Sequence, residues 1–149
     1  MVKRILAIAS GGGHWQQLML MRPAFVEADT MFLTTLPGLP EQFDVMRSAI
    51  VPDCNRNEKL QIIRSAWEIL GHIWRFKPDV VISTGALPGV IAIAIGRAMG
   101  SRTIWVDSVA NAEEMSMSGN LARRFAHLWM TQWEHVAEKT GAEYAGAVL

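Results

Sequence analysis

Hydrophobic positions along the chain follow two periods, one typical of buried strands and the other typical of helices. Strands are predicted where short apolar runs stand between turn residues, at 3–9, 31–35, 77–84, 102–108 and 128–133, with a minor strand at 50–51 and an extended piece from 143. Helices are predicted at 14–28 (interrupted near Pro23), 57–76, 88–99, 120–127 and 134–140, and residues 36–43 predict a loop. This alternation is typical of a doubly wound α/β fold, a mostly parallel, Rossmann-like sheet with helices on both faces.

The composition is that of one globular domain, which we expect to span 1–149. Half of the residues are apolar and 19% are charged, which excludes a disordered chain. Fourteen basic residues balance fourteen acidic ones, and this argues against a nucleic-acid partner, because such proteins carry a basic excess. We expect no second domain, no signal peptide and no membrane-spanning segment.

Cysteine and histidine are too sparse to suggest a metal site. Cys54 is the single cysteine, which excludes an internal disulfide and a cysteine cluster and fits a reducing compartment. The histidines at 72, 127 and 135 show no metal-ligand spacing with one another or with carboxylates. We therefore expect neither a metal nor another cofactor.

Three loops rich in small and polar residues follow predicted strands, at 10–14, 84–89 and 107–119. In a doubly wound sheet, ligands bind beyond the carboxyl ends of the strands. We expect the three loops to meet there and to form one site for a polar ligand.

The first loop belongs to "SGGGHWQQL", residues 10–18. Its glycines, Gly11 to Gly13, permit unusual backbone shapes, and their N–H groups with the start of the next helix can face an anion. The stretch is not a dinucleotide fingerprint, because Gln16 stands where the last glycine is needed, and no P-loop lysine follows. His14 lies in the first helical turn, where a neutral imidazole able to accept a proton is favoured. A purely structural turn and a locally bonded histidine are the alternatives.

The other two loops carry further polar candidates. In "STGALPGV" the glycines at 85 and 89 let a ligand approach the backbone, although ordinary strand-to-helix turn chemistry explains this loop equally well. Asp107 and Ser108 end the strand before the third loop, in which Met115 and Met117 alternate with serines. These methionines either contact a lipid chain or a partner, or fold back into the core.

Six tryptophans and nine methionines are many for this length. They either fill the core or form an exposed face for a membrane or a partner. In the helix predicted at 57–76, the apolar side chains at helical spacing are Leu60, Ile63, Trp67, Leu70, Ile73 and Trp74.

Three segments together resemble one known family: "SGGGHWQQL", "KPDVVISTGALPGV" and "IWVDSVANAEEMSMSGNLARRFAHLWMTQWEH". The chain resembles, over nearly its whole length, the N-terminal half of split GT-B glycosyltransferases. The family's eukaryotic member is the membrane-recruiting subunit of the enzyme that adds the second N-acetylglucosamine to dolichol-linked oligosaccharide. Its bacterial members are PssD-type exopolysaccharide biosynthesis proteins.

The resemblance implies a division of labour between two chains. A partner chain, the C-terminal half, would hold the UDP-sugar. This chain would bind a polyprenyl-diphosphate-linked acceptor and bring the pair to the inner, cytoplasmic face of the cell membrane as a peripheral protein. The reaction would be an inverting, metal-independent displacement of UDP by an acceptor hydroxyl. Alone, this chain would be inactive or nearly so.

The resemblance also assigns the loop residues. His14 or Asp107 would be the general base, although many relatives have Glu in place of Asp107. The residues expected to bind the substrate are Ser10, Gly11, Gly12, Gly13, Ser83, Thr84, Gly85, Pro88, Gly89, Ser108, Asn111, Ser116, Ser118 and Gly119.

Membrane and partner contacts are expected elsewhere on the chain. Eukaryotic members carry an N-terminal transmembrane anchor, which we do not expect in this chain. Membrane contact would then come from the methionine-rich loop and from the first helix through Trp15, Leu18, Met19 and Met21. In the alternative, Leu18 and Met21 are core residues. The segment after Gly141, with Tyr144, Val148 and Leu149, would dock on the partner. Two rival functions remain open, a stand-alone nucleotide- or phosphate-binding module and a non-catalytic membrane adaptor.

Overall fold

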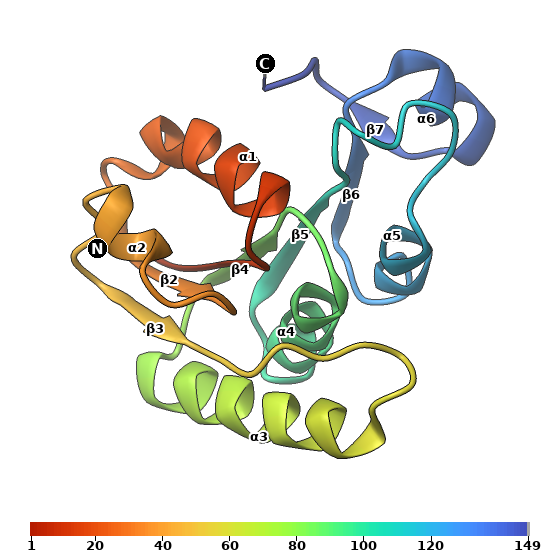
Figure 1. Ribbon diagram of the computed structural model, residues 1–149. Coiled ribbons are helices and arrows are strands. Elements are labelled where there is room, and N and C mark those ends of the chain that lie inside the picture. The colour runs from red at the N-terminus through yellow and green to blue at the C-terminus, as the bar shows by residue number, and fades with distance from the viewer. Residues whose placement is uncertain (149) are drawn as a thin grey trace.

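The computed structural model describes residues 1–148, which form a single seven-stranded sheet with helices on both faces (Figure 1). All strand pairs are parallel, in the order β3-β2-β1-β4-β5-β6-β7. The strands are β1 (Arg4–Ala9), β2 (Asp29–Thr34), β3 (Ser48–Ile50), β4 (Val80–Ser83), β5 (Arg102–Val106), β6 (Leu128–Thr131) and β7 (Glu143–Tyr144). The helices are α1 (Gly13–Met21), α2 (Leu39–Gln42), α3 (Lys59–Phe76), α4 (Leu87–Ala98), α5 (Met117–Ala122) and α6 (Glu134–Thr140), with a 3-10 helix η1 (Arg22–Phe25). This arrangement confirms the predicted Rossmann-like architecture.

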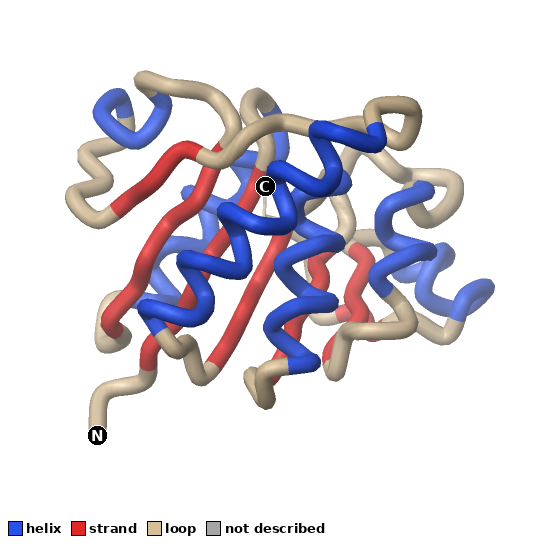
Figure 2. Tube along the Cα trace, turned by 90° about the horizontal axis from the view of Figure 1, so that it is seen from below, coloured by secondary structure: helices blue, strands red, loops and turns tan. Residues whose placement is uncertain are grey.

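Each face of the sheet has its own core, because successive strand residues point to opposite faces. On one face, Ala7 and Ala9 of β1 pack with Trp15 and Leu18 of α1. On the other face, Leu6 and Ile8 pack with side chains of α3, α4, α5 and α6. Figure 2 shows α3 and α4 crossing this second face side by side.

Strand order reverses between β1 and β4, the point at which a doubly wound sheet opens a crevice. The two strands pair in register, with Ile8 opposite Ser83. Their carboxyl ends therefore place the first two predicted loops next to each other. The connections that follow, through α1 and α4, leave on opposite faces.

Three elements differ from the sequence-based prediction. The helix predicted at 14–28 ends at Met21, because Pro23 lacks an N–H and the chain tightens into η1. The loop predicted at 36–43 contains the short helix α2. The helix predicted at 120–127 is instead α5, which starts earlier because Ser116 caps it, its Oγ accepting the Gly119 N–H at 2.8 Å.

We expect His127 to make stability depend on pH. Its Nδ1 accepts the Thr103 N–H at 3.0 Å. Loss of hydration, and then the charges of Arg97 and Arg102, lower the pKa of His127 from its usual 6.5. The unfolded chain then binds the proton more readily, so the free energy of unfolding falls as pH drops through and below 6.5. Denaturant titrations above and below this pH should show a smaller fall for His127→Gln than for the unchanged chain. His135→Gln is the matched control and should behave like the unchanged chain; a fall for His127→Gln as large as that of the unchanged chain would contradict the assignment.

Candidate functional site

The first two loops meet through His14 and Thr84. The Thr84 hydroxyl donates to the His14 carbonyl at 2.6 Å, and His14 Nδ1 lies 3.2 Å from the Thr84 carbonyl oxygen. Because a carbonyl only accepts, these contacts assign the proton of the neutral ring to Nδ1. Nε2 is then the ring's acceptor. A half-buried histidine held in this tautomer is suited to take a proton from a ligand hydroxyl.

Position 85 is a glycine, and the space that a side chain would fill there is occupied by the His14 imidazole. A Cβ at this position would lie 2.1 Å from His14 Nδ1, so any side chain would displace the ring. The next residue, Ala86, has a φ of 69°, which is rare for a residue with a side chain. Such backbone strain is found where a site holds the chain in an otherwise unfavourable shape.

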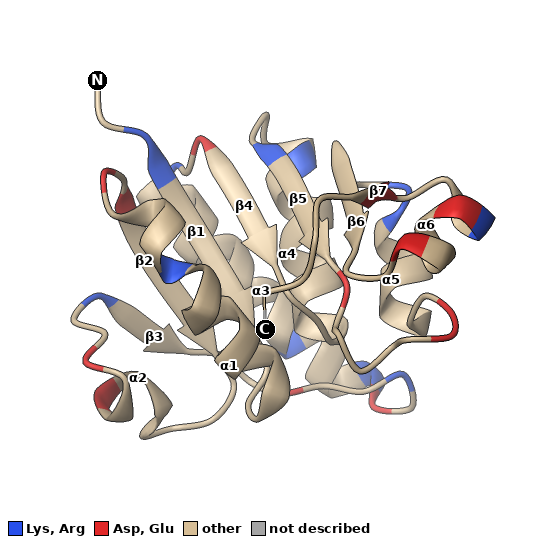
Figure 3. Ribbon diagram, turned by 90° about the horizontal axis from the view of Figure 1, so that it is seen from above, with Lys and Arg blue, Asp and Glu red and all other residues tan. Residues whose placement is uncertain are grey.

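The start of α1 offers unpaired backbone donors. The first bond inside the helix runs from the Gln16 N–H to the Gly12 carbonyl at 3.1 Å, so the N–H groups of Gly13, His14 and Trp15 have no helical acceptor. Gly11 is already used, since its N–H donates to Thr35 Oγ1. α1 contains no Lys, Arg, Asp or Glu, and its ribbon is accordingly uncoloured by charge in Figure 3. An anion here would be bound by N–H groups and the helix dipole.

Gly12 and Gly13 face open space. A Cβ built on either would have nothing within 4 Å. Gly12 has a φ of 72°, which favours glycine, but the backbone of Gly13 is ordinary helix. The fold therefore gives no reason for glycine at 13, where alanine favours the helix by about 1 kcal/mol.

The second loop serves mainly to build the site. Ser83 is fully buried, and its Oγ accepts the Gly85 N–H at 3.2 Å. A Cβ at Gly89 would lie 2.0 Å from that oxygen, and Pro88 is buried in the first turn of α4. The predicted residues Ser83, Pro88 and Gly89 thus have structural roles inside the loop. The residues of this loop that contact His14 are Thr84 and Gly85.

Asp107 organises the third loop. Only 1% of it is exposed, and its carboxylate accepts four hydrogen bonds. Oδ1 accepts from Trp105 Nε1 at 3.0 Å and from Ser116 Oγ at 2.6 Å; Oδ2 accepts from the Ser116 N–H at 2.9 Å and from Asn111 Nδ2 at 3.2 Å. Four donors use the lone pairs of a carboxylate. These contacts fit a positioning role better than the predicted role of general base.

Two glutamines that the sequence did not single out tie α1 to the third loop. Buried Gln17 donates through Nε2 to Ser108 Oγ at 2.9 Å and accepts the Val109 N–H at 3.0 Å. Buried Gln132, at the end of β6, donates to Gln17 Oε1 at 2.6 Å and to the Asp107 carbonyl at 2.9 Å. The sequence could have pointed to Gln17, because it is a polar side chain between Trp15 and Leu18 in an otherwise apolar helix segment. The pair holds α1, which directly follows the first loop, against the third loop.

The remaining predictions have different outcomes in the structure. Trp15 and Leu18 are fully buried, so the expected membrane face on α1 is wrong; the sheet covers that side of the helix. Met115 is also buried, whereas Met117 is exposed.

Ser10, Ser118 and Gly119 lie in or next to these loops, and a Cβ at Gly119 would lie 2.6 Å from Asp107 Oδ1. Of the C-terminal segment, Val148 donates its N–H to Gln132 Oε1 at 3.0 Å, and Leu149 lies outside the described residues.

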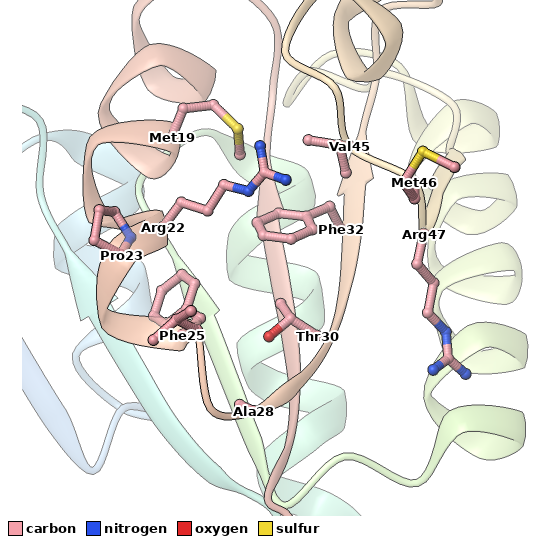
Figure 4. Close-up of a pocket in the computed structure, with 11 residues that line it drawn as sticks. Met19, Arg22, Pro23, Phe25, Ala28, Thr30, Phe32, Val45, Met46 and Arg47 are labelled. Atoms are coloured by element: carbon pink, nitrogen blue, oxygen red, sulfur yellow. The ribbon is translucent and has the colours of Figure 1, made fainter.

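A cavity of about 600 Å³ lies away from these loops (Figure 4). It opens beside η1, β2 and the approach to β3, and none of the predicted site residues lines it. The Arg22 guanidinium there already donates to the carbonyls of Phe43 and Asp44, and Arg47 pairs with Asp29. Its cations are therefore engaged within the fold.

Among residues 1–148, no three His, Cys, Asp or Glu side chains lie close enough together to hold a metal ion. No helix in that range is both long and apolar enough to cross a bilayer.

Comparisons with known proteins agree with this architecture. The family model "Oligosaccharide biosynthesis protein Alg14 like" matches residues 35–148. The UDP-N-acetylglucosamine transferase subunit alg14 of Schizosaccharomyces pombe is 22% identical over 177 residues, which cover 98% of this chain and 83% of the relative.

Solved structures with the same fold are larger. MurG of Acinetobacter baumannii superposes with a TM-score of 0.71 at 12% identity, over 87% of this chain and 41% of MurG. UDP-N-acetylglucosamine 2-epimerase of Rickettsia bellii superposes with a TM-score of 0.74 at 11% identity, over 99% of this chain and 46% of the epimerase. The chain thus spans less than half the length of these structures and shares their Rossmann-like fold.

Proposed function

Because the chain belongs to the family of Alg14-like oligosaccharide biosynthesis proteins, we propose that it is the acceptor-binding subunit of a two-chain glycosyltransferase. A partner chain supplies the other half of the cleft and holds the UDP-sugar. The fission-yeast relative is a subunit of a UDP-N-acetylglucosamine transferase, so UDP-N-acetylglucosamine is the first donor to test. The acceptor is a sugar on a polyprenyl diphosphate, reached by this chain as a peripheral protein on the cytoplasmic side of the membrane.

In the proposed reaction, His14 acts on the acceptor hydroxyl. Nε2 takes the hydroxyl proton while the oxygen forms a bond to the anomeric carbon of the donor sugar. The bond from that carbon to the phosphate oxygen breaks, and UDP leaves with the electron pair. The hydrogen bond from Nδ1 to the Thr84 carbonyl keeps the base oriented during the transfer.

The anion site at the start of α1 would hold the diphosphate of the acceptor. The observation that carries this proposal is the open space at Gly12 and Gly13, beside donors that have no helical acceptor. Phosphates are bound at helix N-termini of this kind because the N–H groups and the dipole both favour negative charge.

Alanine at Gly13 should separate binding from folding. Gly13→Ala fills the open space with a methyl group and leaves the free energy of unfolding unchanged or up to about 1 kcal/mol higher. We expect it to raise the KM for the lipid-linked acceptor about tenfold. The control is Glu27→Ala, which changes an exposed side chain just before β2, at the opposite end of the sheet from the three loops. An unchanged KM would place the diphosphate elsewhere.

Co-expression tests the function as a whole. The chain is produced with a candidate C-terminal-half glycosyltransferase, and the purified pair is assayed with several UDP-sugars and polyprenyl-diphosphate acceptors. We expect a stable pair that transfers sugar and two separate chains that do not. A chain that forms no pair and binds a uridine nucleotide tightly by itself would be a stand-alone binding module. A pair whose rate is indifferent to His14 would make this chain a membrane adaptor.

A further inference from the structure

The outer side of α3 exposes a stripe of large apolar side chains. The exposed fractions are 83% for Leu60, 55% for Ile63, 69% for Trp67 and 64% for Trp74. Steps of three, four and seven residues keep these side chains on one side of a helix. The opposite side of α3 supplies Ile69, Ile73 and Phe76 to the core. The side chains of the stripe are therefore not the ones that pack α3 into the core.

A groove of about 590 Å³ runs between the two tryptophans. Its lining is completed by Leu70, Gly71, Arg75 and Met99. A Cβ at Gly71 would meet only the Arg75 guanidinium, at 3.2 Å. Tryptophan combines a large apolar ring with one N–H donor, and it is enriched where an apolar phase meets water.

The charges around the stripe are mostly positive, although the whole chain is neutral. α3 carries Lys59, Arg64 and Arg75, Glu58 precedes its first residue, and Lys77 follows its last residue. Within α3 the one acidic side chain, Glu68, lies 3.6 Å from Arg64, so that pair is neutralised. Glu58 is next to Lys59 and offsets its charge, whereas Arg75 and Lys77 remain as cations at the end of α3 that carries Trp74. A positive rim around exposed tryptophans is complementary to a negatively charged lipid surface.

The same face of the molecule continues toward the third loop. α4 packs between α3 and α5, and α5 exposes Met117 and Leu121 (Figures 1 and 2). Arg56 and Arg124 flank these two side chains around a cavity of about 320 Å³. Apolar side chains with arginines beside them are thus repeated next to the loop that Asp107 organises.

We propose that the outer face of α3 docks on the surface of an anionic phospholipid bilayer. The docking surface consists of Leu60, Ile63, Trp67, Leu70 and Trp74, with Lys59, Arg75 and Lys77 at its rim. The apolar side chains enter the headgroup region, and the cations pair with lipid phosphates. The inference rests on the proposed function in one respect: the acceptor is anchored in the membrane, and docking would bring the loops to it.

Vesicle sedimentation with the full chain tests the surface. The probes are vesicles of phosphatidylcholine with phosphatidylglycerol and vesicles of phosphatidylcholine alone. We expect binding to the first kind, reduced by salt, and a fall of at least about tenfold in the partition coefficient for Trp67→Ser/Trp74→Ser. Arg75→Glu should also weaken binding.

The matched controls change equally exposed side chains elsewhere. Val26→Ser/Met46→Ser alters two side chains that are 83% and 96% exposed on the opposite face, and Lys139→Glu reverses one charge on α6. Both should bind vesicles like the unchanged chain. Circular dichroism should show that all variants fold, because every altered side chain is exposed.

Two binding results would overturn the proposal. One is vesicle binding that Trp67→Ser/Trp74→Ser leaves unchanged. The other is a dimer in light scattering that these substitutions dissociate, with no vesicle binding, because the stripe would then join two copies of this chain. Neither readout requires transferase activity, so this proposal and the proposed function can fail separately.

In the active pair, the substitutions should slow transfer to a bilayer-embedded acceptor about tenfold and leave transfer to a short, water-soluble acceptor unchanged. Loss of transfer to both acceptors would also overturn the proposal.

Discussion

Replacing His14 with alanine is expected to slow sugar transfer by the two-chain enzyme by about 10²–10⁴-fold, the usual contribution of a positioned general base. The fold should tolerate the change, because the side chain is half-buried and makes one hydrogen bond, to the Thr84 carbonyl. The loss in the free energy of unfolding should be about 1 kcal/mol. Single-turnover rates of the purified pair, with denaturant titrations of the same protein, would measure both effects.

The pH dependence of the rate distinguishes a base from a structural histidine. In the unchanged enzyme, the rate should fall on the acidic side as the base becomes protonated, and His14→Ala should flatten that side. His72→Ala, which removes a half-buried histidine of α3, is the matched control and should keep the profile. A His14→Ala enzyme with an unchanged rate would mean that another residue is the base or that this chain only recruits the catalytic one.

Replacing Asp107 with alanine is expected to destabilise the protein by about 3 kcal/mol, since four buried or half-buried donors lose their acceptor. The third loop should lose its shape with it, because both the N–H and the hydroxyl of Ser116 are held by this carboxylate. Asp107→Asn should cost about 2 kcal/mol, since an amide offers one accepting oxygen where the carboxylate has two. Thermal and denaturant unfolding measure these losses.

Two further variants test the positioning role of Asp107. Glu113→Ala removes an exposed acid from the same loop and should change stability by less than about 0.5 kcal/mol. Ser116→Ala removes the 2.6 Å bond to Asp107 and the cap of α5, so its effect should overlap with that of Asp107→Ala in the double variant. A slow Asp107→Asn enzyme with full stability and a flattened pH profile would make Asp107 a base after all.

The longer elements were predictable because the spacing of their apolar residues and their packing in the structure favour the same type of element. β1, β4 and β5 are short apolar runs buried in the sheet, and α3 and α4 lie within two residues of their predicted bounds. The family resemblance seen in the segments 77–90 and 104–135 is likewise confirmed by the family match, which covers residues 35–148. The shorter helices α2 and α5 span only four and six residues. Helices this short depend on tertiary contacts, which carry little weight in a pattern of apolar positions.

Burial of the tryptophans could not be predicted from their spacing. Trp15 and Trp105 are fully buried, whereas Trp67 and Trp74 are exposed. Helical periodicity shows which side chains share a side of a helix but not which side meets the sheet. α3 has apolar residues on both sides, and only its packing against β-strands and α4 decides between them.

The alternation of strands and helices, the three loops at strand ends and the family were predictable from the chain, because these depend on local spacing and on residue identity. The way in which the loops are joined follows instead from tertiary contacts. Gln17 meets Ser108 across 91 positions of sequence and Gln132 across 115, and the His14 ring lies against Gly85 because β1 and β4 are neighbours in the sheet. Such contacts arise from strand order, and strand order is set by which buried faces fit together over the whole domain, a property that no single segment carries.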